Sequence, residues 1–310
     1  MNKTIVSVVL GSYNRVSFLP LTINSIRAEL ANIPHEIIVI DGGSDDGTLD
    51  YLIKQKDIIT ITQHNRGTWN DKPIERRSWG YFMNLGFKVA QGGYVCMLSD
   101  DCLVVPGAIR NGIKYFDTLI ERNRQVGALA FYWRDWSPKD TPYHVGCTLG
   151  SKMYVNHGMF LNKALQEVGY CDEETFLFYN GDGDLCLKMW QAGYECLDAP
   201  DSYIEHYPHA NIDVRKTNYV RFNQDLKNYL KKWGGVFYDP HVHDVGKIVE
   251  KSFVSPHKTG DRFLSLHEMI IRDNPKLIRR ASHWDKIKQK LRWKWAAGVR
   301  KMRCWFNQAQ

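Results

Sequence analysis

The chain has 310 residues, of which 44% are hydrophobic and 24% charged, and a formal net charge of +7. That length allows one large α/β core or two domains, and the composition is ordinary for a globular protein, which excludes a disordered or fibrous chain. The seven cysteines include no CxxC pair, so we expect reduced cytoplasmic thiols rather than a disulfide framework or a zinc site. No apolar window approaches about 18 uncharged residues and residues 1–10 lack a signal-peptide pattern, so we expect no membrane-spanning segment.

The first two-thirds of the chain alternates apolar strand patterns with amphipathic helix patterns. We predict strands over residues 4–10, 36–40, 58–61, 94–99 and 126–133. Between them we predict helices over residues 19–30, 49–53 and 75–91 and from residue 106 onward. Strands that alternate with helices of this length favour right-handed crossovers. The sequence therefore predicts an α/β fold with a Rossmann-like, mostly parallel central sheet flanked by helices.

Two carboxylates, Asp100 and Asp101, follow the apolar strand pattern of residues 94–99. Open α/β sheets bind ligands just beyond the carboxyl ends of their strands. Charged groups are rarely buried unless they are paired or bound to a metal, and carboxylate oxygens suit a hard divalent cation. A solvated turn explains the pair equally well when the pair is taken alone.

A second acidic cluster lies near residue 182, in a glycine-flanked loop before a predicted helix. Asp184 has the position of an N-cap, whereas Asp182 precedes it and is free to point elsewhere. His206 ends a short strand pattern downstream, where a metal ligand and a structural histidine both remain open.

A third acid, Asp41, ends the second predicted strand, much as the ribose-binding acid does in dinucleotide folds. The turn after the first strand lacks G-x-G-x-x-G, which disfavours a Rossmann dehydrogenase. For residues 45–48 we favour a turn that caps the next helix. For Asp41 we favour a ligand-binding role.

Taken together, these motifs resemble those of family 2 glycosyltransferases of the GT-A fold. They follow the family order between residues 4 and 206: Ser7–Arg15, Val39–Thr48, Asn84–Gly86, Leu98–Asp101, Gly181–Leu185 and His206. The resemblance implies a metal-dependent, inverting transfer of a sugar from a nucleotide-sugar, with UDP as the expected nucleotide. The acceptor that it implies is a hydroxyl of a glycan or a lipid-linked glycan.

The resemblance also implies roles for individual residues. Ser12, Tyr13 and Asp41 would bind the base and ribose. Asp101 and His206 would bind Mn²⁺ or Mg²⁺, and Asp100 would lie at the ribose or the metal. Asp182 would act as the general base on the acceptor hydroxyl.

Three positions depart from the family pattern. Ser99 replaces the first acid of the metal motif, and Gly181 replaces the acid before the general base. Met83 replaces an arginine, whose charge Arg76 or Arg77 is placed to supply.

Aromatic residues gather in the irregular segment 131–160, where we expect an acceptor pocket, although packing explains each of them singly. They are Phe131, Tyr132, Trp133, Trp136, Tyr143, His144, Tyr154 and His157. We expect a glycosyltransferase domain over residues 1–210, with a donor half over 1–105 and an acceptor half over 106–210. A helical extension over residues 211–275 would pack on this domain.

The basic charge of the chain belongs to its tail. Residues 276–303 contain eleven Lys or Arg and one acid, a balance of +10 that leaves −3 for the rest. Trp284, Ile287, Leu291 and Trp295 recur at helical spacing, and a basic amphipathic helix rich in Trp suits an anionic membrane surface. We expect residues 276–310 to hold a cytoplasmic enzyme at the inner face of the membrane; docking on the domain itself, a protein partner or nucleic acid remains open.

Two other functions would explain part of this sequence. A sugar nucleotidyltransferase would also use Asp100 and Asp101 with a metal, but it needs a longer Gly-rich, Lys-containing loop than residues 10–14 provide. A nucleic-acid-binding protein would explain the tail and leave the acidic clusters without a role. The pattern is silent on the oligomeric state.

Overall fold

The computed structural model describes residues 4–135, 142–207, 217–239, 241 and 248–251. All of them belong to Met1–Leu264, the first of two units into which the chain divides. Trp136 and the basic tail 276–310 lie outside the described residues. Within the described ranges, no helix is long and apolar enough to cross a membrane.

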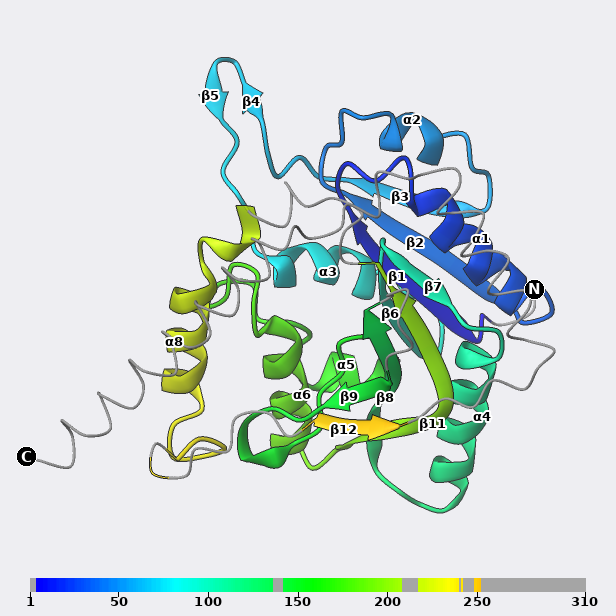
Figure 1. Cartoon of the computed structure of the whole chain (residues 1–310), viewed down its shortest axis with the longest axis vertical. Coiled ribbons are helices and arrows are strands. Elements are labelled where there is room, and N and C mark those ends of the chain that lie inside the picture. The colour runs from blue at the N-terminus through cyan, green and yellow to red at the C-terminus, as the bar shows by residue number, and fades with distance from the viewer. Residues whose placement is uncertain (1–3, 136–141, 208–216, 240, 242–247, 252–310) are drawn as a thin grey trace, which may run out of the picture. The chain divides into compact units, whose positions relative to one another are not determined.

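A single large sheet organises these residues (Figure 1). Its strands follow the order β12–β9–β8–β10–β6–β1–β2–β3, and β11 pairs with both β8 and β7. The strands are β1 (Val6–Ser12), β2 (His35–Asp41), β3 (Ile58–Thr62), β6 (Tyr94–Ser99), β7 (Cys102–Val104), β8 (Val126–Asp135), β9 (Tyr143–Gly146), β10 (Gly158–Leu161), β11 (Glu195–His206) and β12 (Ile248–Lys251). A separate hairpin joins β4 (Thr68–Trp69) to β5 (Lys72–Pro73).

Helices cover both faces of the sheet. The α-helices are α1 (Leu19–Leu30), α2 (Thr48–Leu52), α3 (Trp79–Phe87), α4 (Ala108–Glu121), α5 (Asn162–Glu167), α6 (Gly181–Gln191) and α8 (Phe222–Lys232), with a 3-10 turn, η1 (Leu149–Ser151). Side chains alternate between the faces of a strand, so Val8 and Val9 of β1 enter different cores. Val8 packs with apolar residues of α1 and α4, and Val9 packs with those of α3, α5 and α6. This confirms the predicted α/β class.

The parallel part of the sheet places several loops side by side. β1 pairs in parallel with β2 and β6, and β2 pairs in parallel with β3. In this register Ser12 is opposite Asp41, and Gly11 is opposite Ser99. The loops that follow β1, β2 and β6 therefore leave the same edge of the sheet, where α/β folds bind ligands.

Three elements differ from the expectations. α3 begins at Trp79 rather than near residue 75, because the hydroxyl of Ser78 caps it by accepting the backbone N–H of Tyr81 at 3.0 Å. The strand that ends at His206 is longer than the short pattern predicted, because it spans residues 195–206 with register shifts. Within 211–275 the described residues include α8 but also the strand β12, which pairs with β9.

The described cysteines form no disulfide with one another.

Candidate functional site

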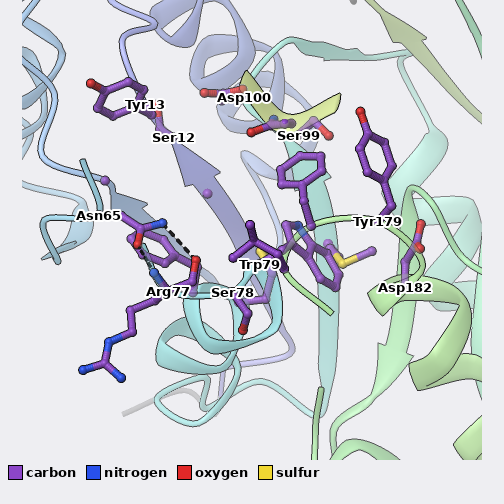
Figure 2. Close-up of a pocket in the computed structure, with 18 of the residues that line it drawn as sticks. Ser12, Tyr13, Asn65, Arg77, Ser78, Trp79, Ser99, Asp100, Tyr179 and Asp182 are labelled. Carbon is purple, nitrogen blue, oxygen red and sulfur yellow. Dashed lines mark hydrogen bonds between the residues drawn. The ribbon is translucent and has the colours of Figure 1, made fainter. Parts of the chain in front are cut away.

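A cavity of about 380 Å³ opens at the carboxyl edge of the parallel strands (Figure 2). Its walls come from the loops after β1, β2 and β6, from the segment between β3 and α3, and from the loop before α6. Six of the seven residues to which the family resemblance gives a role line it: Ser12, Tyr13, Asp100, Asp101, Asp182 and His206. The fold thus joins acids that are more than 80 positions apart in the chain.

Asp41 lies behind this cavity rather than in its lining. Its carboxylate is fully buried and accepts the backbone N–H groups of Gly43 and Ser44, at 2.9 and 2.8 Å, and the Ser44 hydroxyl at 2.7 Å. These bonds shape the turn that presents Gly42 to the cavity. In this structure Asp41 holds the loop, and direct contact with a donor stays a prediction.

One arginine forms ion pairs with both carboxylates. Arg15 Nε is 3.2 Å from Asp100 Oδ1, and Arg15 Nη2 is 3.2 Å from Asp101 Oδ2. Burial raises the pKa of Asp100, and Arg15 offsets only part of that rise. Burial also acts to raise the pKa of Asp101, but the charges of His206 and Arg15 outweigh it and lower this pKa. The two adjacent acids therefore differ in proton affinity.

His206 is oriented by a second carboxylate, that of Asp135. β11 and β8 place these residues opposite each other, and the Nδ1–H of His206 donates to Asp135 Oδ1 at 2.8 Å. This leaves His206 Nε2 directed at Asp101 Oδ1, 3.4 Å away. Burial acts to lower the pKa of His206, but Asp101 and Asp135 outweigh it and raise the pKa to about 9.

These residues fit a divalent cation. Asp101 Oδ1 is buried and lacks a hydrogen bond of good geometry among the described residues. Without a metal ion, the proton on His206 Nε2 is directed at this oxygen, and a bound divalent cation would take the place of that proton. A carboxylate that holds a histidine through Nδ1 is also the usual support of a metal-binding imidazole. Asp101 and His206, with Asp100 beside them, would hold Mn²⁺ or Mg²⁺.

Asp182 lies in the first turn of α6, away from the carboxylate pair. Its Oδ1 accepts the N–H of Gly183 at 2.8 Å, and its Oδ2 is 3.4 Å from Asn156 Nδ2. Burial raises the pKa of Asp182 more than these donors lower it. In Figure 2, Tyr13 lies on one side of Trp79, and Asp182 lies on the other. The cavity thus has two chemically different ends.

The glycines beside Asp182 provide space. A Cβ at Gly181 would lie 2.8 Å from Trp79 Cε3, and a Cβ at Gly183 would lie 2.8 Å from the Tyr229 hydroxyl. Both glycines belong to α6, whose N-terminal flanking residue is Asn180 with φ of 66°. Close approach by Trp79 and Tyr229, rather than backbone freedom, therefore requires glycine here.

Asp184 is not the N-cap that the sequence predicted, because α6 begins three residues earlier, at Gly181. Its carboxylate is fully buried and pairs with Lys232 Nζ at 2.8 Å. It also accepts the indole N–H of Trp233 at 2.9 Å. Asp184 thus joins α6 to the end of α8.

The expected aromatic acceptor pocket is not built from residues 131–160. Of the described residues in that range, Asn156 alone lines the cavity, while Phe131, Tyr132, Tyr143 and His157 are buried. They belong to strands and turns in the centre of the sheet, so they pack internally. The aromatic lining comes instead from Tyr13, Trp79, Phe82, Phe178 and Tyr179.

Several residues that shape the cavity were missed. One of them is Arg66. It lines the cavity together with Arg76, which the sequence had suggested as a substitute charge, and both donate to the side-chain oxygen of Asn218. Asp225 of α8 accepts the backbone N–H groups of residues 177, 178 and 179, at 3.0, 2.9 and 2.9 Å. Arg15 was identifiable, because it follows the first strand within the family motif. Asn218 and Asp225 have no local signal, since their partners are distant in the sequence.

Comparison with known proteins agrees with the family resemblance. Residues 7–121 match the family model described as glycosyl transferase family 2. This part of the chain is therefore similar to family 2 glycosyltransferases. The chain is 27% identical over 111 residues to a chondroitin synthase of Pasteurella multocida (strain Pm70), covering 34% of this chain and 10% of that protein. It is 30% identical over 115 residues to the uncharacterized glycosyltransferase alr2836 of Nostoc sp. (strain PCC 7120), covering 36% of this chain and 33% of that protein. The matches thus span a tenth and a third of these relatives.

Solved glycosyltransferases share the fold. The crystal structure of S. aureus TarS 1-349 aligns with a TM-score of 0.50 and 15% identity, covering 75% of this chain and 72% of that one. The mannosyltransferase PcManGT from Pyrobaculum calidifontis, in complex with GDP-Man and Mn²⁺, aligns with a TM-score of 0.52 and 17% identity, covering 90% and 73%. These likenesses confirm the predicted GT-A type fold.

Proposed function

We propose that this protein transfers a sugar, with inversion, from a nucleotide-sugar to a hydroxyl of a glycan or lipid-linked glycan. One observation carries the proposal. A single cavity is lined by the carboxylate pair with His206 and also by Asp182, which lies apart from them beyond Trp79. Inverting transfer needs a site for the leaving diphosphate and a base on the other face of the sugar.

The donor would bind at the end of the cavity formed by the loops after β1 and β2. Ser12, Tyr13 and Asn65 line that end, and in Figure 2 Ser12 and Tyr13 lie toward Asp100 while Asn65 lies beside Arg77. Asp101 and His206 would hold Mn²⁺ or Mg²⁺, which when bound supplies positive charge to the departing diphosphate. The fold neighbour in complex with GDP-Man and Mn²⁺ supports a nucleotide-sugar and a metal. The family resemblance favours UDP, so both nucleotides belong in the test.

The acceptor would bind beside Asp182. Trp79 and Tyr179 provide apolar ring surfaces next to this carboxylate, suited to the faces of a sugar ring. Asp182 would take the proton of the attacking hydroxyl, and the pKa that burial raises strengthens it as a base. A positioned base contributes about 10²–10⁴-fold to rate.

Ligand-induced thermal stabilisation tests the donor site. UDP, GDP and dTDP are each added with and without Mn²⁺ to the wild-type chain, to Asp101→Asn and to the exposed control Asp50→Asn. One nucleotide with Mn²⁺ should stabilise the wild type and the control more than either ligand alone, by about 2.7 kcal/mol at a hundred times the dissociation constant. Asp101→Asn should lose the metal-dependent part. An undiminished metal response in that variant would remove Asp101 from the metal site.

For the basic tail we propose attachment to the cytoplasmic face of an anionic membrane. The support is its composition: eleven Lys or Arg among residues 276–303, with Trp at helical spacing. Truncation before Lys276 should abolish sedimentation with phosphatidylserine vesicles and leave donor hydrolysis intact, and high salt should release the full chain. Full-length protein that stays in the supernatant at low salt would refute the attachment.

A further inference from the structure

A thiol and two imidazoles meet directly beside the carboxylate pair. Cys102, His157 and His206 each offer one ligand atom, and these atoms all lie within 4.8 Å of one another. The strand pairing explains part of this, because Cys102 of β7 is directly opposite His206 of β11. Facing residues on paired strands project to the same side of the sheet. His157 enters from the residue just before β10, with its ring centroid 5.4 Å from that of His206.

His157 has unusually weak partners for a buried imidazole. It is 1% exposed, and within the described residues its ring nitrogens contact only the Cys102 Sγ, at 3.8 Å. Buried polar groups are nearly always satisfied, so a thiol contact this weak needs an explanation.

The proposed glycosyl transfer gives Cys102 and His157 no role. Asp101 and His206 line the cavity, whereas Cys102 and His157 do not. Trp133 packs edge-on against both histidine rings, with centroids 5.8 and 5.7 Å away. The three donors therefore form a second, deeper group that reaches the cavity through His206.

The chemistry of this group differs from that of the carboxylate pair. Mg²⁺ and Mn²⁺ favour carboxylate oxygens, whereas a thiolate with two imidazoles favours Zn²⁺. Nitrogen and sulfur ligands of one tetrahedral zinc ion lie about 3.3–3.8 Å apart, from bond lengths of about 2.0–2.3 Å. Cys102 Sγ is 3.8 Å from both His157 nitrogens, close to this spacing, so the sulfur faces the ring between them. Rotation of the imidazole or of the thiol would direct one nitrogen lone pair at a metal ion shared with the sulfur. A fourth position would remain for water or for Asp101.

We propose that Cys102, His157 and His206 bind a thiophilic divalent cation, represented by Zn²⁺, at a site distinct from the Mn²⁺ or Mg²⁺ site. Binding exchanges the thiol proton of Cys102, released to solvent, for a sulfur–zinc bond, and nothing is oxidised or reduced. His206 serves both sites, so zinc binding would compete with its place beside Asp101. The zinc site itself does not depend on the proposed transferase activity.

The experiment uses Zn²⁺ or Co²⁺ alone with the full chain, in a parent variant that carries Cys147→Ser and Cys304→Ser. Cys147 is only partly buried and Cys304 lies outside the described residues, so these changes remove two thiols that would otherwise compete as ligands. Cobalt should give the parent a near-ultraviolet charge-transfer band typical of a thiolate ligand, and titration calorimetry should show one zinc ion per chain. Cys102→Ala in this parent should lose the band and weaken zinc binding at least about tenfold. Cys96→Ala, a matched change at another fully buried cysteine, should keep both.

The parent chain tests the zinc site even if Cys102→Ala fails to fold. Circular dichroism would reveal such a failure. A parent that binds no zinc, or that binds cobalt without a thiolate band, would overturn the proposal. An unchanged band in a folded Cys102→Ala variant would also overturn it. Neither result depends on a nucleotide, on Asp101 or on Asp182, so failure here is distinguishable from failure of the proposed glycosyl transfer.

Discussion

One carboxylate ties α8 to the wall of the cavity, and its removal should cost both stability and donor affinity. Asp225 is 2% exposed and accepts the backbone N–H groups of Leu177, Phe178 and Tyr179. In Asp225→Asn, the best amide orientation keeps the oxygen that accepts from Phe178 and Tyr179. It turns the NH₂ group toward the N–H of Leu177, which then has no acceptor.

The magnitude follows from these bonds. A hydrogen bond to a charged group contributes about 1.5–3 kcal/mol, and a buried donor left without a partner costs about 1–3 kcal/mol. We therefore expect Asp225→Asn to lose about 2–4 kcal/mol, or about 5–15 °C in Tm for a domain of this size. Because residues 177–179 line the cavity, nucleotide affinity should fall as well.

Differential scanning calorimetry and nucleotide titration measure the two effects. Asn223→Ala, an exposed change on the same helix, serves as the control and should shift Tm by less than about 2 °C. If Asp225→Asn melted within about 2 °C of the wild type, the three hydrogen bonds would contribute no net stability. Reasoning from their geometry would then be refuted.

Two further predictions concern packing and pH. Gly181→Ala should lower the free energy of unfolding by about 1–3 kcal/mol and change the tryptophan fluorescence of the nucleotide-free protein, because its Cβ would lie 2.8 Å from Trp79 Cε3. Gly93→Ala, whose Cβ would lie 3.9 Å from its nearest neighbour, is the control. Equal stability in the two variants would contradict the packing argument. Burial acts to raise the pKa of Asp172, but hydrogen bonds from Lys232 and two backbone N–H groups outweigh burial and lower the pKa. The ionised carboxylate therefore stabilises the fold above about pH 4, and this stabilisation is lost as pH falls further. Urea unfolding should show Asp172→Asn about 1–2 kcal/mol less stable than wild type at pH 7, and this gap should narrow steadily as pH falls from about 4 toward 2. A gap that does not change with pH would contradict this sign.

The parallel half of the fold was predictable from the sequence because its information is local. Buried parallel strands are continuous apolar runs, and β1, β2 and β6 are such runs. The carboxyl ends of such strands lie at one edge of the sheet, so residues that follow them, such as Ser12 and Asp101, are expected to lie near one another. The structure placed them in one cavity.

The acceptor side was less predictable because its contacts join distant segments. Whether an aromatic residue faces a cavity or the core depends on which strand lies beside it, and Phe131 and Tyr143 proved to be core. Asp184 resembled a cap from its position in the chain, but its partners, Lys232 and Trp233, are 48 and 49 residues away. No local pattern reports such pairings.

The central claim is that Asp182 acts on the acceptor and not on the donor. Its most direct test is sugar transfer by Asp182→Asn, with UDP- and GDP-sugars supplied against a panel of glycan acceptors and products counted by mass spectrometry. The amide keeps an oxygen for the Gly183 N–H but accepts no proton, so transfer should fall by about 10²–10⁴-fold while nucleotide affinity with Mn²⁺ changes less than about threefold. Near-normal transfer by this variant would contradict the account, as would a loss of transfer matched by an equal loss of nucleotide affinity.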